Sequence, residues 1–215
     1  MTPTYAYDIR LPDKMEPGKL YPTIFTLHGK GSNERNMANL TEPLENDFIL
    51  VHVRGDLILG SGYQYYELKG LGNPVRESFD RAANLLTAFI EDAIARHPID
   101  PARVYLLGFS QGAILSMTLA LTLGSRLKGI VALNGYVPDF VKTEYVLRDT
   151  SDVSVFISHG ERDSIFPVRI GHDNAAYFGT RTDKLTYKLY PTDHGVSEQN
   201  QSDFVDWLRR DSHAE

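Results

Sequence analysis

The chain has 215 residues, which is long enough for one domain with a substantial core and short for two independent domains. Its formal net charge of −6 and its lack of a basic run argue against nucleic acid or an anionic membrane as a partner, because both favour clustered Lys and Arg. The sequence contains no cysteine, which excludes disulfides, thiolate metal sites and a cysteine nucleophile.

The amino terminus, Met1 to Tyr5, lacks the basic start and apolar region of a secretory signal. No uncharged apolar run approaches the roughly 18 residues that a membrane-spanning helix needs. We find no internal repeat, low-complexity tract or linker. The sequence therefore predicts a single domain over residues 1–215, a cytoplasmic location and no insertion into a membrane.

The first part of the chain alternates short apolar runs with a helical stretch. Residues 5–11 alternate in the manner of a half-buried strand, and the turn-rich residues 12–18 predict a first hairpin with a strand at 21–28. A short amphipathic helix is expected over 34–44 and a third strand over 48–53.

Residues 54–74 are irregular, contain five glycines and form a connection too long to be routine in a compact domain, which indicates a functional segment. Its tyrosines Tyr63, Tyr65 and Tyr66 fit two roles equally well, as the lining of an apolar acyl pocket or as anchors of the loop. We include them in the expected substrate pocket, together with Tyr136 and Phe166.

Helices and strands continue to alternate in the second part of the chain. Helices are expected over 75–97, 111–123, 168–178 and 197–210, and strands over 103–109, 127–133, 153–159 and 185–190. Residues 139–152 are left unassigned and could cover the site. This alternation predicts an α/β fold with a mostly parallel, doubly wound sheet and helices on both faces.

One motif stands where strand 103–109 meets the following helix. Gly108-Phe109-Ser110-Gln111-Gly112 has the pattern G-x-S-x-G of a nucleophile elbow. The turn lifts the Ser110 hydroxyl clear of the sheet through a strained backbone conformation, and a Cβ two residues away on either side would crowd it. The same pattern also occurs in purely structural turns flanked by glycines. The assignment of Ser110 as a nucleophile therefore depends on catalytic partners elsewhere in the chain.

Ser110, Asp163 and His194 each follow a predicted strand, at the edge where the functional groups of doubly wound sheets collect. A serine hydroxyl needs an imidazole to take its proton, and the imidazole needs a carboxylate to hold the useful tautomer. We therefore predict Ser110 as nucleophile, His194 as base and Asp163 as acid, with Glu161 and Asp139 as weaker alternatives for the acid.

Other histidines compete with His194. His159 ends a strand and is expected to pack there with a hydrogen bond, His172 lies on a helix, and His213 lies in a frayed tail. His28 is expected to shape the loop after its strand. No histidine pair has metal-ligand spacing such as His-Glu-x-x-His, so we expect no metal.

Attack by Ser110 creates an oxyanion that needs preorganised donors. The backbone N–H of Gln111 is one expected donor, aided by the positive end of the helix that it begins. The backbone N–H of Lys30, in the glycine loop after His28, is the other. The Lys30 side chain is not required.

Together these residues resemble the α/β-hydrolase superfamily, and within it the small phospholipase/carboxylesterase group, which includes acyl-protein thioesterases and is related to dienelactone hydrolases. The resemblance covers nearly the whole chain. It implies Ser110, Asp163 and His194 as the triad, Lys30 and Gln111 as oxyanion donors, and a hydrolase without a cofactor. The motifs that carry it are Leu27-His28-Gly29-Lys30-Gly31, Gly108-Phe109-Ser110-Gln111-Gly112-Ala113, His159-Gly160-Glu161-Arg162-Asp163 with Pro167, and Asp193-His194-Gly195.

The chain departs from the group at three places. Ser32 stands where many members have Asp, Leu133-Asn134-Gly135 stands where many have Leu-Ser-Gly, and the loop near Tyr63 lacks the usual Trp. These differences leave the substrate open. Because dienelactone hydrolases use a cysteine at the elbow, Ser110 argues against that activity.

The sequence thus predicts a serine hydrolase that cleaves carboxylic esters through an acyl-enzyme. Because the chain has few residues left over for a lid domain, we expect esters of small to medium acyl chains. A thioesterase or peptidase with the same triad is an alternative, as is a hydrolase fold retained as a non-catalytic binding module. The expected partner is a small-molecule ester, and a homodimer is a further option.

Overall fold

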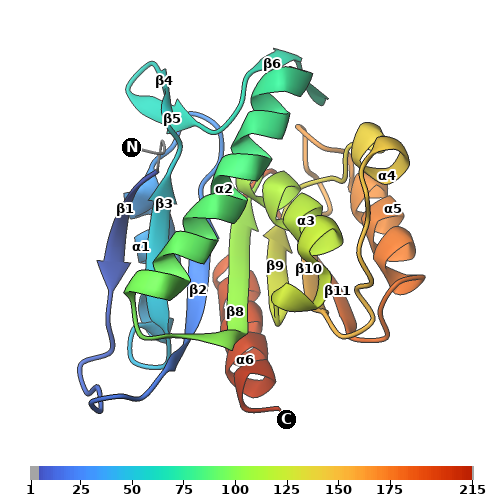
Figure 1. The fold of residues 1–215 in the computed structure, drawn as a ribbon. Coiled ribbons are helices and arrows are strands. Elements are labelled where there is room, and N and C mark those ends of the chain that lie inside the picture. The colour runs from blue at the N-terminus through green and yellow to red at the C-terminus, as the bar shows by residue number, and fades with distance from the viewer. Residues whose placement is uncertain (1–4, 215) are drawn as a thin grey trace.

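The computed structural model describes residues 5–214, so residues 1–4, which belong to the stretch examined for a secretory signal, lie outside the described part. A seven-stranded sheet forms the centre of the molecule (Figure 1). Its strands are, in spatial order, β1 (Ala6–Arg10), β3 (Ile49–Arg54), β2 (Tyr21–Leu27), β8 (Ile99–Phe109), β9 (Gly129–Leu133), β10 (Ser154–Gly160) and β11 (Leu185–Tyr190). All neighbouring strands are parallel except β1, which is antiparallel to β3.

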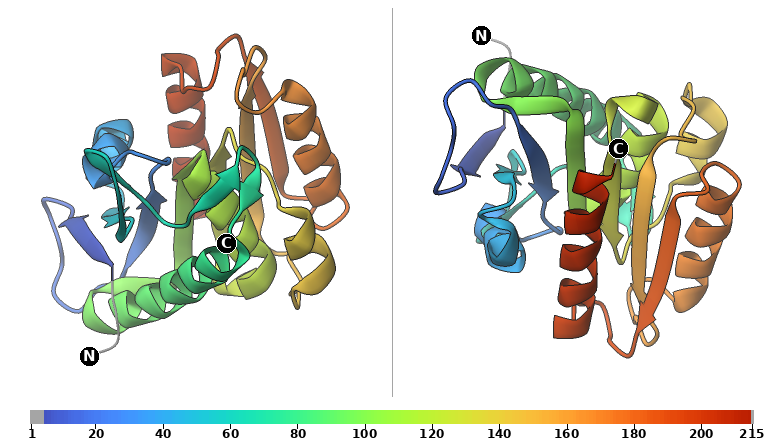
Figure 2. Two further views of the ribbon diagram at one scale, coloured as in Figure 1. Left: turned by 90° about the horizontal axis from the view of Figure 1, so that it is seen from above. Right: turned by 90° about the horizontal axis from the view of Figure 1, so that it is seen from below.

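Helices cover both faces of the sheet. One face carries α2 (Arg76–Arg96), α3 (Gln111–Leu123), α4 (Asp139–Glu144) and α5 (Val168–Gly179). The other face carries α1 (Glu34–Thr41), the short helix η1 (Glu42–Leu44) and α6 (Glu198–His213). Figure 2 shows α1 and α6 on the opposite side of the sheet from α2 and α3. The expected mostly parallel, doubly wound sheet is confirmed.

Successive residues of the central strands enter two different cores. Ile24 and Leu107 pack on the face of α1 and α6, whereas Phe25 and Leu106 pack on the face of α2 and α3. Because both faces are covered, these strands are apolar at consecutive positions and do not alternate between apolar and polar residues. This burial explains why the strands were recognisable from continuous apolar runs.

The predicted hairpin between the first two strands is wrong. β1 pairs with β3, with Ala6 opposite Arg54 and Arg10 opposite Leu50, and β2 lies between β3 and β8. All seven residues of β2 are buried, whereas β1 is largely exposed. A strand buried along its whole length requires neighbours on both sides, so β2 takes a central place and the more polar β1 forms the edge.

Residues 54–74 form two small hairpins at the edge of the sheet where the site lies. β4 (Leu57–Leu59) pairs with β5 (Gly62–Gln64), and β6 (Leu68–Gly70) pairs with β7 (Asn73–Pro74). A bridge between Ser32 and Tyr63 joins the first hairpin to the glycine loop after β2.

The end of the chain is more regular than predicted. α6 continues to His213, so the expected frayed tail at this residue is wrong. The last turn is anchored because Asp211 accepts hydrogen bonds from Tyr105 Oη (2.8 Å) and Ser154 Oγ (2.6 Å). Within residues 5–214, none of the helices combines the length and apolar character needed to cross a bilayer.

Candidate active site

Ser110 lies on the tight turn between β8 and α3, with φ 53° and ψ −112°. Its backbone N–H donates to the Leu133 carbonyl at the end of β9 (2.9 Å). A Cβ on Gly112 would lie 2.0 Å from the Leu27 carbonyl oxygen, and a Cβ on Gly108 would lie 2.2 Å from the Gly112 carbonyl oxygen. The expected reason for both glycines is confirmed, because no side chain fits at either position.

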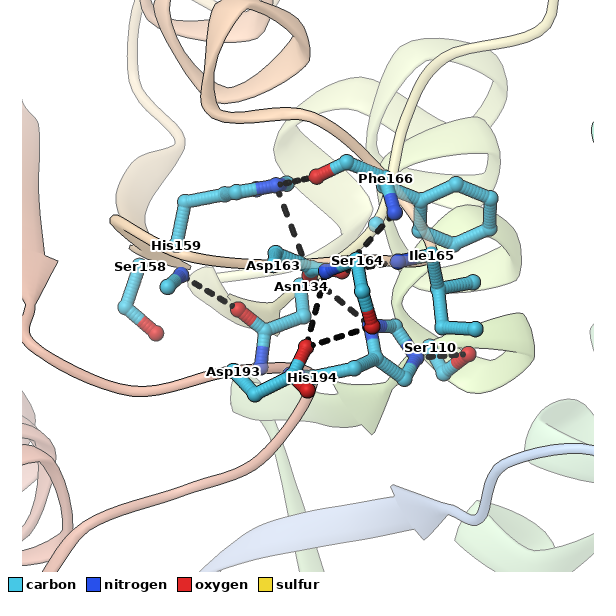
Figure 3. Close-up of polar contacts among 12 residues, drawn as sticks. Ser110, Asn134, Ser158, His159, Asp163, Ser164, Ile165, Phe166, Asp193 and His194 are labelled. Atoms are coloured by element: carbon cyan, nitrogen blue, oxygen red, sulfur yellow. Dashed lines mark hydrogen bonds and ion pairs between the residues drawn. The ribbon is translucent and has the colours of Figure 1, made fainter.

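His194 lies between Ser110 and Asp163 (Figure 3). Its Nε2 is 2.9 Å from Ser110 Oγ, and its Nδ1 is 2.8 Å from Asp163 Oδ2. The other carboxylate oxygen, Oδ1, accepts the backbone N–H groups of Ile165 (2.9 Å) and Phe166 (2.8 Å). The Asp163 side chain is fully buried, so these bonds fix the carboxylate toward the imidazole. The structure thus brings the three predicted side chains into one hydrogen-bonded chain.

The competing histidines take other places. His159 is buried, with Nε2 2.7 Å from the Phe166 carbonyl oxygen and 3.6 Å from Asp163 Oδ2. Burial lowers the pKa of His159, which favours the neutral imidazole. His172 lies on α5, with Nδ1 3.3 Å from the Tyr187 hydroxyl. The expectation that His159 packs with a hydrogen bond is confirmed.

The competing carboxylates face solvent. Glu161 is exposed on the turn after β10, and the Asp139 side chain, which is 97% exposed, pairs with Lys142 at 3.3 Å. Within the described chain, neither carboxylate forms a hydrogen bond or ion pair with Ser110, His194 or Asp163.

The glycine loop after β2 lies directly against the elbow. A Cβ on Gly29 would be 3.5 Å from Ser110 Cβ and 3.1 Å from the Phe109 ring. Lys30 and Gln111 line the cleft beside Ser110. Within the described chain, the backbone N–H of neither residue donates to a backbone carbonyl, so both groups are available to an oxyanion.

The buried side chain of His28 holds the same loop through two hydrogen bonds. Its Nδ1 lies 2.7 Å from the Gly29 carbonyl oxygen, and its Nε2 accepts the Gly55 N–H at 2.9 Å. Burial lowers the pKa of His28, in keeping with the acceptor role of Nε2. This position agrees with the expectation that His28 shapes the loop.

The side chain of Gln111 has a role that the sequence did not indicate. It is buried, its Oε1 accepts the Tyr65 N–H (2.8 Å) and its Nε2 donates to the Tyr66 carbonyl (2.9 Å). These bonds tie the aromatic loop to the start of α3. The sequence indicates a role only for the backbone of Gln111, because a glutamine at a helix start gives no local signal of a distant loop partner.

A cleft of about 780 Å³ opens beside Ser110. Three of the expected pocket residues, Tyr66, Tyr136 and Phe166, line it. Eight further apolar side chains line it: Met37, Leu40, Leu68, Leu71, Phe109, Ile114, Ile165 and Val196. An apolar cleft next to a serine hydroxyl can hold the acyl or alcohol part of a substrate.

The expected pocket needs one correction, because Tyr63 and Tyr65 lie outside this cleft. The Tyr65 hydroxyl donates to the Val53 carbonyl (2.8 Å) and accepts the His28 N–H (3.2 Å), which buries its ring beside β3. The Tyr63 ring lies against the Arg54 guanidinium at 4.5 Å. Both tyrosines anchor the loop, which is the alternative role considered from the sequence.

Asp193 links the turn of Asp163 to the loop of His194. Its Oδ1 accepts Ser164 N–H (2.8 Å), Ser164 Oγ–H (2.8 Å) and His194 N–H (2.7 Å). These hydrogen bonds, the Ser164 N–H first among them, lower the pKa of Asp193. Among residues 5–214, no group of three or more His, Asp or Glu side chains is arranged to hold a metal ion.

Comparison with known proteins places the chain in a family. Residues 16–210 match the Phospholipase/Carboxylesterase family. Acyl-protein thioesterase 1 of Kluyveromyces lactis is 25% identical over 224 residues, which cover 94% of this chain and 96% of the relative. Acyl-protein thioesterase 1 of Eremothecium gossypii is 30% identical over 145 residues, which cover 65% of this chain and 60% of the relative.

Solved structures share the fold. A Bacillus cereus carboxylesterase has a TM-score of 0.85 at 19% identity, covering 96% of this chain and 94% of its own. A carboxylesterase from Mesorhizobium loti has a TM-score of 0.84 at 19% identity, covering 97% and 96%. These neighbours confirm the expected α/β-hydrolase fold. This chain belongs to the phospholipase/carboxylesterase family of α/β-hydrolases and is a hydrolase that acts on ester bonds.

Proposed function

We propose that this enzyme cleaves carboxylic esters of small to medium acyl chains through an acyl-enzyme formed on Ser110. The observation that carries the proposal is the hydrogen-bonded chain from Ser110 Oγ to His194 Nε2 (2.9 Å) and from His194 Nδ1 to Asp163 Oδ2 (2.8 Å) beside the cleft. A hydroxyl, an imidazole and a buried carboxylate in this order are the groups that nucleophilic acyl transfer needs.

In the first half-reaction, Ser110 Oγ attacks the ester carbonyl carbon while His194 Nε2 takes the hydroxyl proton. The carbonyl oxygen becomes an oxyanion, which the backbone N–H groups of Lys30 and Gln111 bind. Asp163 keeps the Nδ1 proton of His194 in place and stabilises the imidazolium. His194 then gives its proton to the alcohol oxygen as the C–O bond breaks, which leaves the acyl group on Ser110.

In the second half-reaction, water attacks the acyl carbon and His194 takes a proton from it. Collapse of the second tetrahedral intermediate releases the carboxylic acid, and Ser110 Oγ recovers its proton from His194. The apolar cleft of about 780 Å³ beside Ser110 has room for such an acyl chain. The proposed partner is accordingly a small-molecule ester.

Thioesters are the second candidate substrates, because relatives that match most of this chain are named acyl-protein thioesterases. The same nucleophile and oxyanion donors serve both bonds. Butyryl esters of an alcohol and of the matching thiol, compared by kcat/KM, decide between the two substrates. A higher value for the alcohol ester supports the carboxylesterase proposal.

Hydrolysis of p-nitrophenyl acetate, butyrate, octanoate and palmitate, followed by absorbance, tests the proposal. We expect the shorter esters to be cleaved faster than palmitate, and Ser110→Ala to lower kcat by a factor on the order of 10⁴ or more. A fluorophosphonate probe should label the wild type and not Ser110→Ala.

Ser116→Ala is the matched control, because Ser116 lies on the same helix with its hydroxyl bound to the Gly112 carbonyl (2.9 Å). It should keep both activity and labelling. Full activity of Ser110→Ala would overturn the assignment of the nucleophile.

A further inference from the structure

The last residue of β9 and the residue that follows it contact all three segments that carry the proposed catalytic groups. β9 lies between β8, which leads to Ser110, and β10, which leads to Asp163. The Leu133 carbonyl accepts the N–H of Ser110 (2.9 Å), and the next residue, Asn134, donates its N–H to the Ser158 carbonyl of β10 (3.0 Å). This strand end contributes no group to the proposed chemistry, yet it joins the strands on either side of it.

The side chain of Asn134 extends these contacts to the two loops that meet at the imidazole (Figure 3). Its Oδ1 accepts the N–H of Gly160, the last residue of β10 and the start of the turn to Asp163 (2.9 Å). Its Nδ2 donates to the carbonyl of Gly195, the residue that follows His194 (2.8 Å). One amide therefore binds the segment of the acid and the segment of the base at the same time.

The bond to Gly160 is buried and the bond to Gly195 is partly buried, and together they define the orientation of the amide. Asn134 is 0% exposed. Gly160 offers only an N–H at this point and Gly195 only a carbonyl oxygen, so the amide oxygen must face Gly160 and the amide nitrogen must face Gly195. Loss of the first bond would leave the buried N–H of Gly160 without a partner.

The backbone of Asn134 adopts a strained conformation at the turn that places its side chain between the two loops. Its φ of 52° lies in the left-handed region, where asparagine is one of the few tolerated residues with a side chain. The turn brings Gly135 against α3, where a Cβ on Gly135 would lie 2.7 Å from Ala113 Cβ. Strain held in place by surrounding contacts is typical of functional sites.

We propose that Asn134 is a positioning residue that keeps the loops of Asp163 and His194 in register, so that the imidazole stays within hydrogen-bond distance of both Ser110 and the carboxylate. This inference rests on the proposed function of those three residues. Asn134 reaches neither the substrate nor the reacting atoms, and it acts through the two loops. A shift of about 1 Å in such an arrangement can lower the rate on the order of 10²-fold.

Two substitutions separate the amide from the strained turn. Asn134→Gly removes the amide and relieves the positive φ, whereas Asn134→Ala removes the amide and keeps a Cβ in the left-handed region. Because kcat depends on the amide, we expect both variants to lose roughly 10- to 100-fold in kcat on p-nitrophenyl butyrate, with KM within about twofold of wild type. Because strain depends on the Cβ, Asn134→Ala should melt at a lower temperature than Asn134→Gly.

Asn200→Ala is the matched control for loss of a buried amide. The Asn200 side chain is buried in the first turn of α6 and donates to Ser158 Oγ (2.9 Å), and within the described chain it forms no hydrogen bond with Gly160 or Gly195. It should lower the melting temperature and leave kcat within about twofold of wild type. All assays are run below the melting temperature of each variant, with near-ultraviolet circular dichroism to verify folding.

The outcomes distinguish this inference from the proposed function. If Asn134→Gly is folded and keeps wild-type kcat, the positioning role is wrong, whatever the result for Asn134→Ala. If Asn134→Ala does not fold, Asn134→Gly still decides the question. If the wild type itself neither hydrolyses the ester nor reacts with the fluorophosphonate probe, the proposed function fails first and independently of Asn134.

Discussion

The α-carbon of Gly112 lies so close to the main chain of Leu27 that a Cβ at this position would meet the Leu27 carbonyl oxygen at 2.0 Å. Gly112→Ala must therefore push the start of α3 away from β2, and with it the elbow from the loop of Lys30. We expect this substitution to lower the free energy of unfolding by about 3 kcal/mol, as severe overpacking does. Urea unfolding measures the change, and ester hydrolysis should fall with it.

Gly179→Ala provides the comparison. A Cβ on Gly179 would find its nearest neighbour, Leu185 Cδ2, at 3.7 Å, an ordinary contact. Its free energy of unfolding should stay within about 0.5 kcal/mol of wild type. Equal urea midpoints for Gly112→Ala and Gly179→Ala would contradict the close packing of Gly112 on Leu27.

Asp163→Asn tests the proposed acid by a change of one atom. The amide keeps the shape of the carboxylate, and its oxygen can still accept the N–H of Ile165 or Phe166. It carries no charge to stabilise an imidazolium and cannot enforce the tautomer of His194, so kcat should fall by a factor on the order of 10⁴. Glu161→Gln, at the exposed carboxylate two residues earlier, should keep wild-type kcat. A similar loss of kcat in both variants would mean that activity depends on the structure of this turn and not on the Asp163 carboxylate.

Gln111→Met separates the side chain of Gln111 from its backbone N–H. The substitution removes both side-chain bonds and leaves the buried N–H of Tyr65 and carbonyl of Tyr66 without partners. The free energy of unfolding should fall by about 2 kcal/mol. Because the backbone N–H remains as an oxyanion donor, kcat should fall much less than in Ser110→Ala.

Gln199→Met is the control, because Gln199 is exposed and its side chain donates to Asp203 at 3.0 Å on the surface of α6. Thermal unfolding and kcat of the two variants, measured side by side, check the prediction. A kcat for Gln111→Met as low as that of Ser110→Ala would mean that the side chain itself takes part in the chemistry.

The sequence identified the elements that have a strong local signal. The central strands are buried on both faces and appear in the sequence as continuous apolar runs. The elbow is recognisable from its glycines, because close packing excludes a side chain at Gly108 and at Gly112. Ser110, Asp163 and His194 were recognisable because each directly follows such a strand, and parallel strands bring their ends to one edge.

Features that depend on distant partners were not predictable in the same way. The pairing of β1 with β3 follows from how deeply β2 is buried, which no local turn signal reveals. In the loop of Tyr63, Tyr65 and Tyr66, no periodicity tells which ring faces the cleft, and Tyr65 turns inward because Val53 and His28 supply partners for its hydroxyl.

The buried imidazole of His52 should make the free energy of unfolding depend on pH. It is buried, its Nδ1 lies 2.9 Å from Thr26 Oγ1, and within the described chain its Nε2 has no hydrogen-bond partner. Burial lowers the pKa of His52 from 6.5 to about 4. Between these two values the unfolded chain binds a proton at His52 that the folded protein does not, so the folded protein loses stability as the pH falls from about 6.5 toward 4. The loss from this residue amounts to about 3 kcal/mol at the lower end.

Urea unfolding of wild type and His52→Gln at several pH values between 7.5 and 4 measures this contribution. A glutamine does not titrate, so the variant should lose less stability over this range than the wild type, even if its stability at pH 7.5 is lower. His213→Gln, a substitution at the exposed end of α6, should keep the wild-type pH dependence. If His52→Gln keeps it as well, the acid sensitivity must come from other buried groups, and His28 and His159, whose pKa values burial also lowers, are the next to replace.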